Sequence, residues 1–225
     1  GTCRFALSPV SAGLTLSANG RLTLQCAPDD FAAHALSLSD PELSDWWRQA
    51  QFNHTLSGSS PALAEAAFAA MSEKGIGIVS LHHNMGAHSK WDQFRKIIGG
   101  KFILQACEID GKKYKQSGWD HDQDLNVTVA DKNHPITQGI EDFKIHDETY
   151  IGYYVAPDVK VLLKTDHPKN NPQLAWVTSY GKSKVFYLML GHDKKAYGGN
   201  LEGTPNPNSN YSKLVHQGIR WAAGK

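Results

Sequence analysis

Histidine and carboxylate side chains gather in four short clusters of this sequence. The clusters are His82-His83-Asn84, the segment HDQD at residues 121–124, His146-Asp147-Glu148, and Gly191-His192-Asp193. Imidazole nitrogens and carboxylate oxygens can hold a divalent metal ion such as Zn²⁺, or they can transfer protons near neutral pH. A single histidine at a strand end is more often structural, but four such clusters weaken that interpretation for the set.

Two of the clusters directly follow segments with the composition of buried strands. Residues 76–81 (IGIVSL) precede the first pair of histidines, and residues 185–190 (VFYLML) precede Gly191-His192-Asp193. In open α/β sheets, ligands bind outside the carboxyl ends of the strands. The fold can therefore bring clusters that are distant in sequence to one rim of a sheet.

Residues 143–155 (FKIHDETYIGYYV) predict a rim strand with ionisable residues in its middle. Alternate side chains of a strand face opposite ways, so His146, Glu148 and Tyr150 share one face, with Asp147 and Thr149 on the other. We expect one face to serve a pocket and the other to anchor a neighbouring loop.

These clusters supply the candidate residues for a site. The predicted catalytic residues are His82, His83, His121, His146, Asp147, Glu148, His192 and Asp193. If a divalent metal such as zinc is bound, the candidate ligands are His82, His83, His192 and Glu148. No HExxH-type local spacing supports a metal, so metal-free acid–base catalysis stays open. Trp176, Tyr180 and Tyr197 are candidates for stacking on a sugar, although aromatic residues on strands more often belong to the core.

Helix signals flank the first of these strands. Ser60-Pro61 predicts a helix that ends at Gly75, Ser89 predicts a second helix that ends at Gly99-Gly100, and Ser209 predicts a terminal helix. The second half is richer in strands, at residues 125–130, 144–155, 159–165 and 174–190, the last with a hairpin around Gly181. Helices and strands joined by short connections are typical of an α/β sheet.

The N-terminal 60 residues carry weaker signals. Residues 3–8, 14–17 and 21–26 predict short strands, and Asn19-Gly20 predicts a hairpin turn. We expect residues 1–60 to belong to the same domain as residues 61–225. Residues 194–208 form a Gly/Pro/Asn-rich loop, of the length that is typical of lids and binding loops.

The composition narrows the classes of partner. The chain has 225 residues with 40% hydrophobic content, and a formal net charge of +1 from 23 basic and 22 acidic residues. This balance argues against nucleic acid as the main partner, because phosphate binding requires a basic excess or stripe. No run reaches the roughly 20 apolar residues of a membrane-spanning helix. Three widely spaced cysteines argue against a disulfide framework, and the compartment, cytoplasmic or exported, stays open.

Several motifs in fixed order resemble the ThuA-like (trehalose utilization) family. They are GIGIVSLHHNMGAHSKWDQFRKIIGGKF, HDQDLNVTVADKNHPITQGIEDFKIHDETY, PDVKVLLKTDHPKNNPQLAWVTSYGKSKVFYLMLGHD and GIRWAAGK, within roughly residues 61–225. The resemblance implies a flavodoxin-like three-layer α/β/α sandwich, with a mostly parallel central sheet and an added hairpin, related to class I glutamine amidotransferases. It also implies a setting in bacterial disaccharide catabolism, where sugars pass through 3-keto intermediates.

The covalent nucleophile of the amidotransferases is missing from the corresponding position. A tight Gly-x-Cys-x-Gly turn is expected after a central strand, but residues 80–86 read SLHHNMG and contain no thiol. Ser80 lacks the flanking glycines, and Gly-x-Ser-x-Gly occurs nowhere in the chain. Cys107 also lacks flanking glycines, which favours a buried, inert thiol. Acyl transfer through a covalent intermediate is therefore disfavoured.

Two functions fit these residues. The first is an enzyme, a sugar hydrolase, lyase or isomerase, that acts on a keto-disaccharide by acid–base or metal-assisted chemistry. The second is a non-catalytic module that binds a sugar, or a partner enzyme such as a sugar dehydrogenase, on an amidotransferase-like fold without its nucleophile.

Overall fold

The chain divides into two compact units, Gly1–Ile76 and Gly77–Lys225. The computed structural model describes residues 68–70, 72–192, 196 and 209–225, and the backbone of three short strands nearer the N-terminus. The assignment of residues 1–60 to the same domain as residues 61–225 stays a prediction.

The first unit contains a small antiparallel sheet. Its strands are β1 (Cys3–Ala6), β2 (Gly13–Leu16) and β3 (Leu22–Leu24), in the order β1-β2-β3. The strands that the sequence predicts here are confirmed, whereas Asn19-Gly20 lies outside the described residues. Residues 68–70 and 72–74 are helical, and Gly75 has a φ of 74°, so the predicted glycine end of this helix is confirmed.

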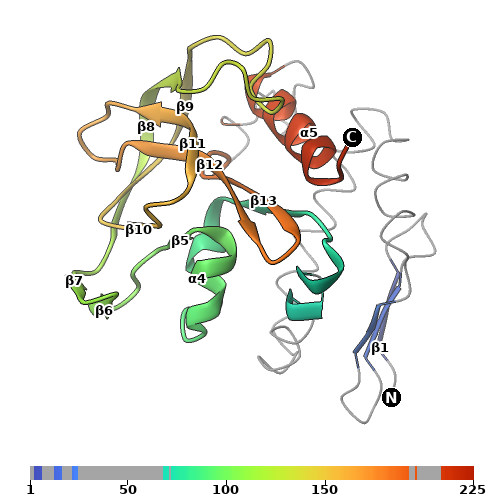
Figure 1. The fold of residues 1–225 in the computed structure, drawn as a ribbon. Coiled ribbons are helices and arrows are strands. Elements are labelled where there is room, and N and C mark those ends of the chain that lie inside the picture. Colours follow the sequence, from blue (N-terminus) through green and yellow to red (C-terminus); the bar gives the residue numbers. More distant parts are fainter. Residues whose placement is uncertain are drawn as a thin grey trace. The chain divides into compact units, whose positions relative to one another are not determined.

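A six-stranded sheet organises the second unit (Figure 1). Its order is β4-β13-β12-β11-β8-β9. The strand bounds are β4 (Ile78–Leu81), β8 (Gly118–Val129), β9 (Phe143–Ile151), β11 (Lys160–Thr165), β12 (Gln173–Tyr180) and β13 (Ser183–Leu188). Two small sheets accompany it, β5 (Gly100–Lys101) with β10 (Tyr154–Val155), and β6 (Cys107–Ile109) with β7 (Lys112–Tyr114).

The prediction of a mostly parallel sheet is wrong. Within the six-stranded sheet only β4 and β13 pair in parallel, and the other four pairings are antiparallel. A parallel pair needs a long crossover connection, usually a helix, whereas the chain joins β8 to β9, β11 to β12 and β12 to β13 directly as antiparallel neighbours. The predicted hairpin at Gly181, which has a φ of 57°, is confirmed between β12 and β13.

Three helical segments are described in this unit. They are the 3₁₀-helix η1 (His82–Gly86), α4 (Asp92–Ile98) and α5 (Asn210–Ala222). Ser209 caps α5 as predicted, since its hydroxyl accepts a hydrogen bond from the Ser212 amide. The predicted start of α4 at Ser89 is wrong, because Trp91 is the N-cap and Ser89 lies in the preceding turn. Gly99 ends α4 with a φ of 72°, as expected.

Helices α4 and α5 pack on opposite faces of the sheet. On β13, Phe186 lies directly under Gly218 of α5, while the neighbouring residue Tyr187 stacks on Trp176 of β12 at 4.4 Å. Trp176 in turn donates its indole N–H to the carbonyl of Ile98 in α4, at 2.8 Å. Successive side chains of a strand point to opposite faces. The part of the sheet around β12 and β13 is therefore the middle of three layers.

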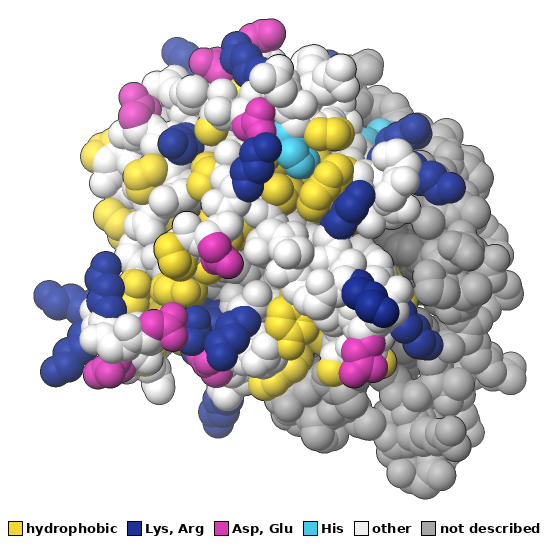
Figure 2. Space-filling view, in the orientation of Figure 1, with side chains coloured by type: hydrophobic (Ala, Val, Ile, Leu, Met, Phe, Trp, Pro, Cys, Tyr) yellow, Lys and Arg dark blue, Asp and Glu magenta, His cyan; other side chains and the backbone are white. Residues whose placement is uncertain are grey.

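The surface of the second unit carries charges of both signs. Figure 2 shows basic and acidic side chains interspersed over one face, with several basic ones on the projecting β6–β7 hairpin, where Lys112 and Lys113 are exposed. Among the described residues, no helix has both the length and the apolar character that crossing a membrane requires.

The close contact between α5 and β13 depends on a glycine. A Cβ atom added at Gly218 would lie 2.3 Å from Cδ1 of Phe186, whose side chain is fully buried. Gly218→Ala should therefore lower the free energy of unfolding by about 1–2 kcal/mol, since overpacking outweighs the better helix propensity of alanine. At Gly86 the nearest atom to such a Cβ is 3.9 Å away, so Gly86→Ala is the matched control. Urea denaturation of both variants measures the difference, and equal stabilities would contradict this packing.

Candidate functional site

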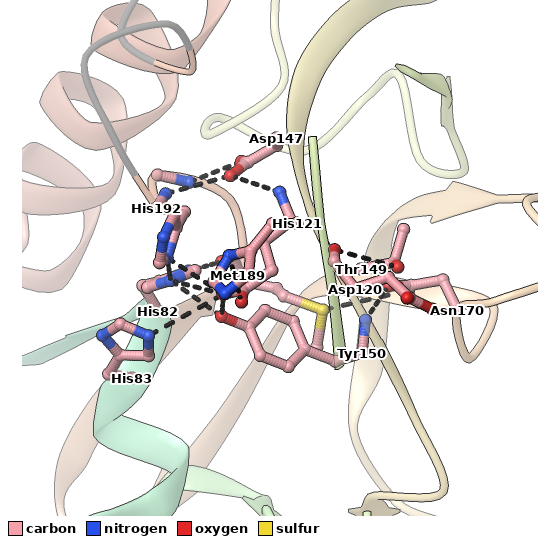
Figure 3. Close-up of polar contacts among 12 residues, drawn as sticks. His82, His83, Asp120, His121, Asp147, Thr149, Tyr150, Asn170, Met189 and His192 are labelled. Atoms are coloured by element: carbon pink, nitrogen blue, oxygen red, sulfur yellow. Dashed lines mark hydrogen bonds and ion pairs between the residues drawn. The ribbon is translucent and has the colours of Figure 1, made fainter. Parts of the chain in front are cut away.

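Three histidines meet at the carboxyl ends of the parallel pair β4 and β13. His82 and His83 follow β4 in η1, and His192 follows β13. Because β4 and β13 are parallel neighbours, the residues after them lie at the same end of the sheet. The Nε2 atom of His82 lies 3.2 Å from Nδ1 of His192, and the rings of His82 and His83 are 4.1 Å apart between centroids (Figure 3).

Glu148 reaches these histidines from β9, the opposite edge strand of the sheet. Its Oε2 atom lies 2.9 Å from Nδ1 of His192, 3.7 Å from Nε2 of His82 and 3.8 Å from Nε2 of His83. The two edges of the six-stranded order can meet in this way only because the sheet curls. We call His82, His83, Glu148 and His192 the His–Glu cluster.

A β-bulge directs His121 at the same carboxylate. In the β8–β9 ladder Asp120 pairs with Thr149 and Gln123 pairs with Asp147, so His121 and Asp122 together oppose Glu148. Asp122 adopts a φ of 53°, the left-handed conformation that accommodates the extra residue. As a result Nδ1 of His121 lies 2.9 Å from Oε1 of Glu148, while most of the His121 ring faces solvent.

The environment of His82 fixes its protonation and its orientation. Its Nδ1–H donates to the carbonyl oxygen of Met189 at 2.5 Å, which leaves the lone pair of Nε2 facing the cluster. Burial, followed by the charge of His83, lowers the pKa of His82 to about 3, so the ring is neutral at pH 7. Its backbone has a φ of 45°, and Tyr187 O–H donates to its carbonyl at 2.7 Å. A neutral imidazole with a backbone carbonyl behind it is the usual form of a metal-binding histidine.

Tyr150 is a member of the site that the sequence-based list of candidates lacks. Its O–H donates to Oε2 of Glu148, and its oxygen also lies 2.9 Å from Nε2 of His82. Burial, together with the hydrogen bond to Glu148, raises the pKa of Tyr150, so the hydroxyl keeps its proton at neutral pH. The period-two pattern of the strand was the available signal, because Tyr150 follows Glu148 on the same face.

Asp147 supports the turn that carries His192. Its buried carboxylate accepts hydrogen bonds from the amides of Gly191 at 2.7 Å, His192 at 3.0 Å and Glu148 at 2.9 Å. Burial raises the pKa of Asp147 from its ordinary value. Asp147 therefore positions a neighbouring loop and contributes no atom to the His–Glu cluster. The sequence did not say which face of β9 would do this, and the predicted catalytic role of Asp147 stays a prediction.

Another predicted residue, His146, does not join the described cluster. The ring of His146 lies between two exposed carboxylates, with Nδ1 at 2.8 Å from Asp124 and Nε2 at 3.2 Å from Asp122. His146 shares the face of Glu148 but lies two residues before it in β9, where it pairs directly with Asp124 and where the bulge places Asp122. Asp193 lies outside the described residues. Cys107 is half-buried in β6, less buried than expected.

The donor atoms of the His–Glu cluster fit a divalent metal ion. One atom from each of its four residues lies within 4.8 Å of the others. In a tetrahedral zinc site with bonds of about 2.1 Å, neighbouring ligand atoms are roughly 3.4 Å apart. The spacings around His192, at 2.9 and 3.2 Å, are already this short. His83 lies further out, with Nε2 3.8 Å from Glu148 and 70% of its side chain exposed.

The sequence matches one family over most of its length. The model of the ThuA family, described as trehalose utilisation, matches residues 41–222. The chain belongs to the ThuA family. The match begins at residue 41, earlier than the motifs that resemble this family, which lie within roughly residues 61–225. Membership of the family supports a carbohydrate-related role in general terms. A search of curated proteins found no match.

A solved ThuA-like structure shares the fold. A ThuA-like protein from Parabacteroides merdae is 21% identical with a TM-score of 0.56, and the alignment covers 72% of this chain and 66% of that one. A ThuA-like protein from Bacteroides uniformis is 21% identical with a TM-score of 0.49, over 70% of this chain and 62% of that one. The likeness to the Parabacteroides merdae structure fits a flavodoxin-like fold, although the sheet described above is mixed. This ThuA chain spans about two thirds of the length of either protein.

The hydrogen bonds of Asp147 should be needed for the stability of the His192 turn. In Asp147→Asn an amide N–H₂ replaces one of the accepting oxygens and faces a backbone N–H. We expect the free energy of unfolding to fall by about 1–3 kcal/mol, the usual result when a buried donor loses its acceptor. Asp124→Asn, at an exposed carboxylate on the neighbouring strand, should change it little. Chemical denaturation compares the two, and an unchanged Asp147→Asn would contradict the role of this carboxylate.

Proposed function

We propose that this ThuA chain is a carbohydrate-processing enzyme whose His–Glu cluster binds a divalent metal ion. The main support is the convergence of three imidazoles and one carboxylate, with one donor atom of each inside a 4.8 Å group. The hydrogen bond from His82 Nδ1 to the Met189 carbonyl adds support, because it leaves Nε2 available as a ligand. The family description, trehalose utilisation, supplies the substrate class.

A metal ion at this position would polarise a carbonyl or hydroxyl oxygen of a bound sugar, as zinc does when a coordination position is open. Neighbouring side chains hold the carboxylate of Glu148 in place beside this position. Glu148 is buried, with 3% of its side chain exposed, and is fixed by the Tyr150 hydroxyl and by His121. Its negative charge offsets the positive charge of a divalent ion at the cluster.

His121 is the proposed acid–base group. Its Nδ1 lies 2.9 Å from Glu148, and 58% of its side chain is open to solvent. The other exposed histidine of the site, His83, lies further from Glu148, at 3.8 Å, and is a proposed metal ligand. A ring at the edge of the cluster can accept a proton from a sugar carbon next to a carbonyl, or from a water molecule. Such C–H groups in keto-sugars are acidic, so isomerisation, elimination and hydrolysis all suit this arrangement.

A covalent route receives no support from the described residues. Ser80 is fully buried in β4, and its hydroxyl accepts a hydrogen bond from the Asn84 side chain. The His–Glu cluster itself contains no thiol. We therefore propose a hydrolase, lyase or isomerase that has no serine or cysteine nucleophile.

The alternative is a module that binds a sugar or a partner enzyme without turnover. The hydrogen bonds of Glu148 favour it, because His121, His192 and Tyr150 satisfy the buried carboxylate without any metal. The two functions differ in whether a keto-sugar is consumed.

Turnover of a keto-disaccharide should depend on the cluster and on a metal. We expect 3-ketotrehalose, followed by NMR, to be consumed by the purified chain, and chelation to stop this until zinc or another divalent ion is restored. Glu148→Gln and His192→Ala should each lower kcat/KM by at least about 100-fold. His146→Ala removes a histidine of the same strand that lies outside the cluster, and should keep nearly full activity.

The outcomes separate the two functions. Binding of 3-ketotrehalose without consumption would replace the enzyme by the binding module. Full activity of both cluster variants would leave the site without a role. Activity that survives chelation but is lost in Glu148→Gln would retain acid–base catalysis and remove the metal from the proposal.

A further inference from the structure

An exposed tryptophan lies beside the His–Glu cluster. Trp119 is 54% exposed, the highest value among the large hydrophobic residues described. In the β8–β9 ladder it pairs directly with Tyr150. Directly paired residues of antiparallel strands project from the same face of a sheet. Trp119 therefore shares the face of Tyr150 and Glu148, and it lies two residues before His121.

Phe102 connects Trp119 to the site. Its ring lies 5.8 Å from the Tyr150 ring in an edge-to-face arrangement of 89°, and 6.5 Å from the Trp119 ring. The Tyr150 ring lies 5.4 Å from the ring of His82. We call Tyr150, Phe102 and Trp119 the aromatic row. It leads from the buried end of the cluster to solvent, with each step at a distance typical of aromatic pairs.

A backbone hydrogen bond links the aromatic row to the helix that carries two of the histidines. The amide of Phe102 donates to the carbonyl of Met85 at 3.0 Å, and Met85 belongs to η1, the helix that begins with His82 and His83. The inner ring, Tyr150, is buried, whereas Phe102 is half-buried and Trp119 is open. The outer part of the aromatic row therefore presents apolar ring surface to solvent, next to the His–Glu cluster.

The aromatic residues that the sequence suggested for stacking on a sugar do not offer an exposed ring beside the cluster within the part of the chain that the structure describes. Trp176 is fully buried against Tyr187 and belongs to the core. Tyr180 accepts a hydrogen bond from the side chain of Gln93 at 2.6 Å, and Tyr197 lies outside the described residues. Among the described aromatic side chains, Trp119 combines high exposure with a place on the face of the cluster.

We propose that Trp119, with Phe102 beside it, binds a second sugar ring of the substrate while the reacting ring lies at the His–Glu cluster. The C–H faces of a pyranose pack against aromatic rings and its hydroxyls stay solvated, which suits a ring with one open face. The substrate class is then a glycoside of at least two rings, and a monosaccharide fills only the reacting position. This inference rests on the proposed function.

Binding of trehalose and glucose to the zinc-loaded chain tests the proposal. Calorimetry should show that Trp119→Ala weakens trehalose binding about tenfold, the effect of losing one aromatic contact surface. Glucose binding should change by less than about twofold. Trp119→Phe retains an aromatic face and should recover most of the trehalose affinity.

Ile151→Ala is the matched control. Ile151 is 44% exposed on the same pair of strands, but it adjoins Tyr150 in sequence and so projects from the opposite face. It should leave both sugars unaffected. Thermal melting of all variants checks folding, and their zinc content checks the cluster.

Each outcome supports or overturns the second-ring position. Equal trehalose affinities in wild type and Trp119→Ala overturn it, as does an equal loss in Ile151→Ala. Absence of trehalose binding to the wild type also overturns it. If zinc binding and turnover of 3-ketotrehalose persist in that case, the proposed function survives and only the role of Trp119 fails.

Discussion

The burial of one carboxylate, Glu148, is the constraint on which the rest of the site depends. A carboxylate with 3% of its side chain exposed is costly unless its oxygens are paired. Here His121 contacts one oxygen, while His192 and the Tyr150 hydroxyl contact the other. These partners come from three strands or their ends, so the charge is satisfied only when the sheet has curled to bring β9 beside the ends of β4 and β13. The site and the curl of the sheet therefore require each other.

The polar groups around Glu148 divide into a buried side and an exposed side. Hydrogen bonds hold the buried side of the cluster, from His82 to the Met189 carbonyl and from the His192 amide to Asp147. The outer side is open, since His83 and His121 are mostly exposed. A site that holds a charge and also admits a substrate usually combines preorganised buried groups with accessible outer groups. The aromatic row continues the open side along the face of the sheet.

Much of the cluster could be predicted from the sequence, because residues that follow buried strands gather at one rim. His82, His83 and His192 met this expectation, and the alternation of β9 separated Glu148 from Asp147. The position of His146 could not be predicted, since it depends on a bulge in β8 that gives two residues to one partner. The mixed order of the sheet was also missed, because composition marks a strand as buried without stating the direction of its neighbour. The role of Trp119 could not be predicted either, because its exposure and its pairing with Tyr150 depend on the register of β8 against β9 in the folded protein.

The central claim is that the His–Glu cluster binds a metal ion through three imidazoles and one carboxylate. Anomalous diffraction at the zinc edge, from crystals of the chain grown with zinc, tests this most directly. We expect one anomalous peak at about 2.0–2.2 Å from Nε2 of His82, from a nitrogen of His83 and of His192, and from a carboxylate oxygen of Glu148. A cluster without a peak, with Glu148 still bonded directly to His192 and Tyr150, would contradict it.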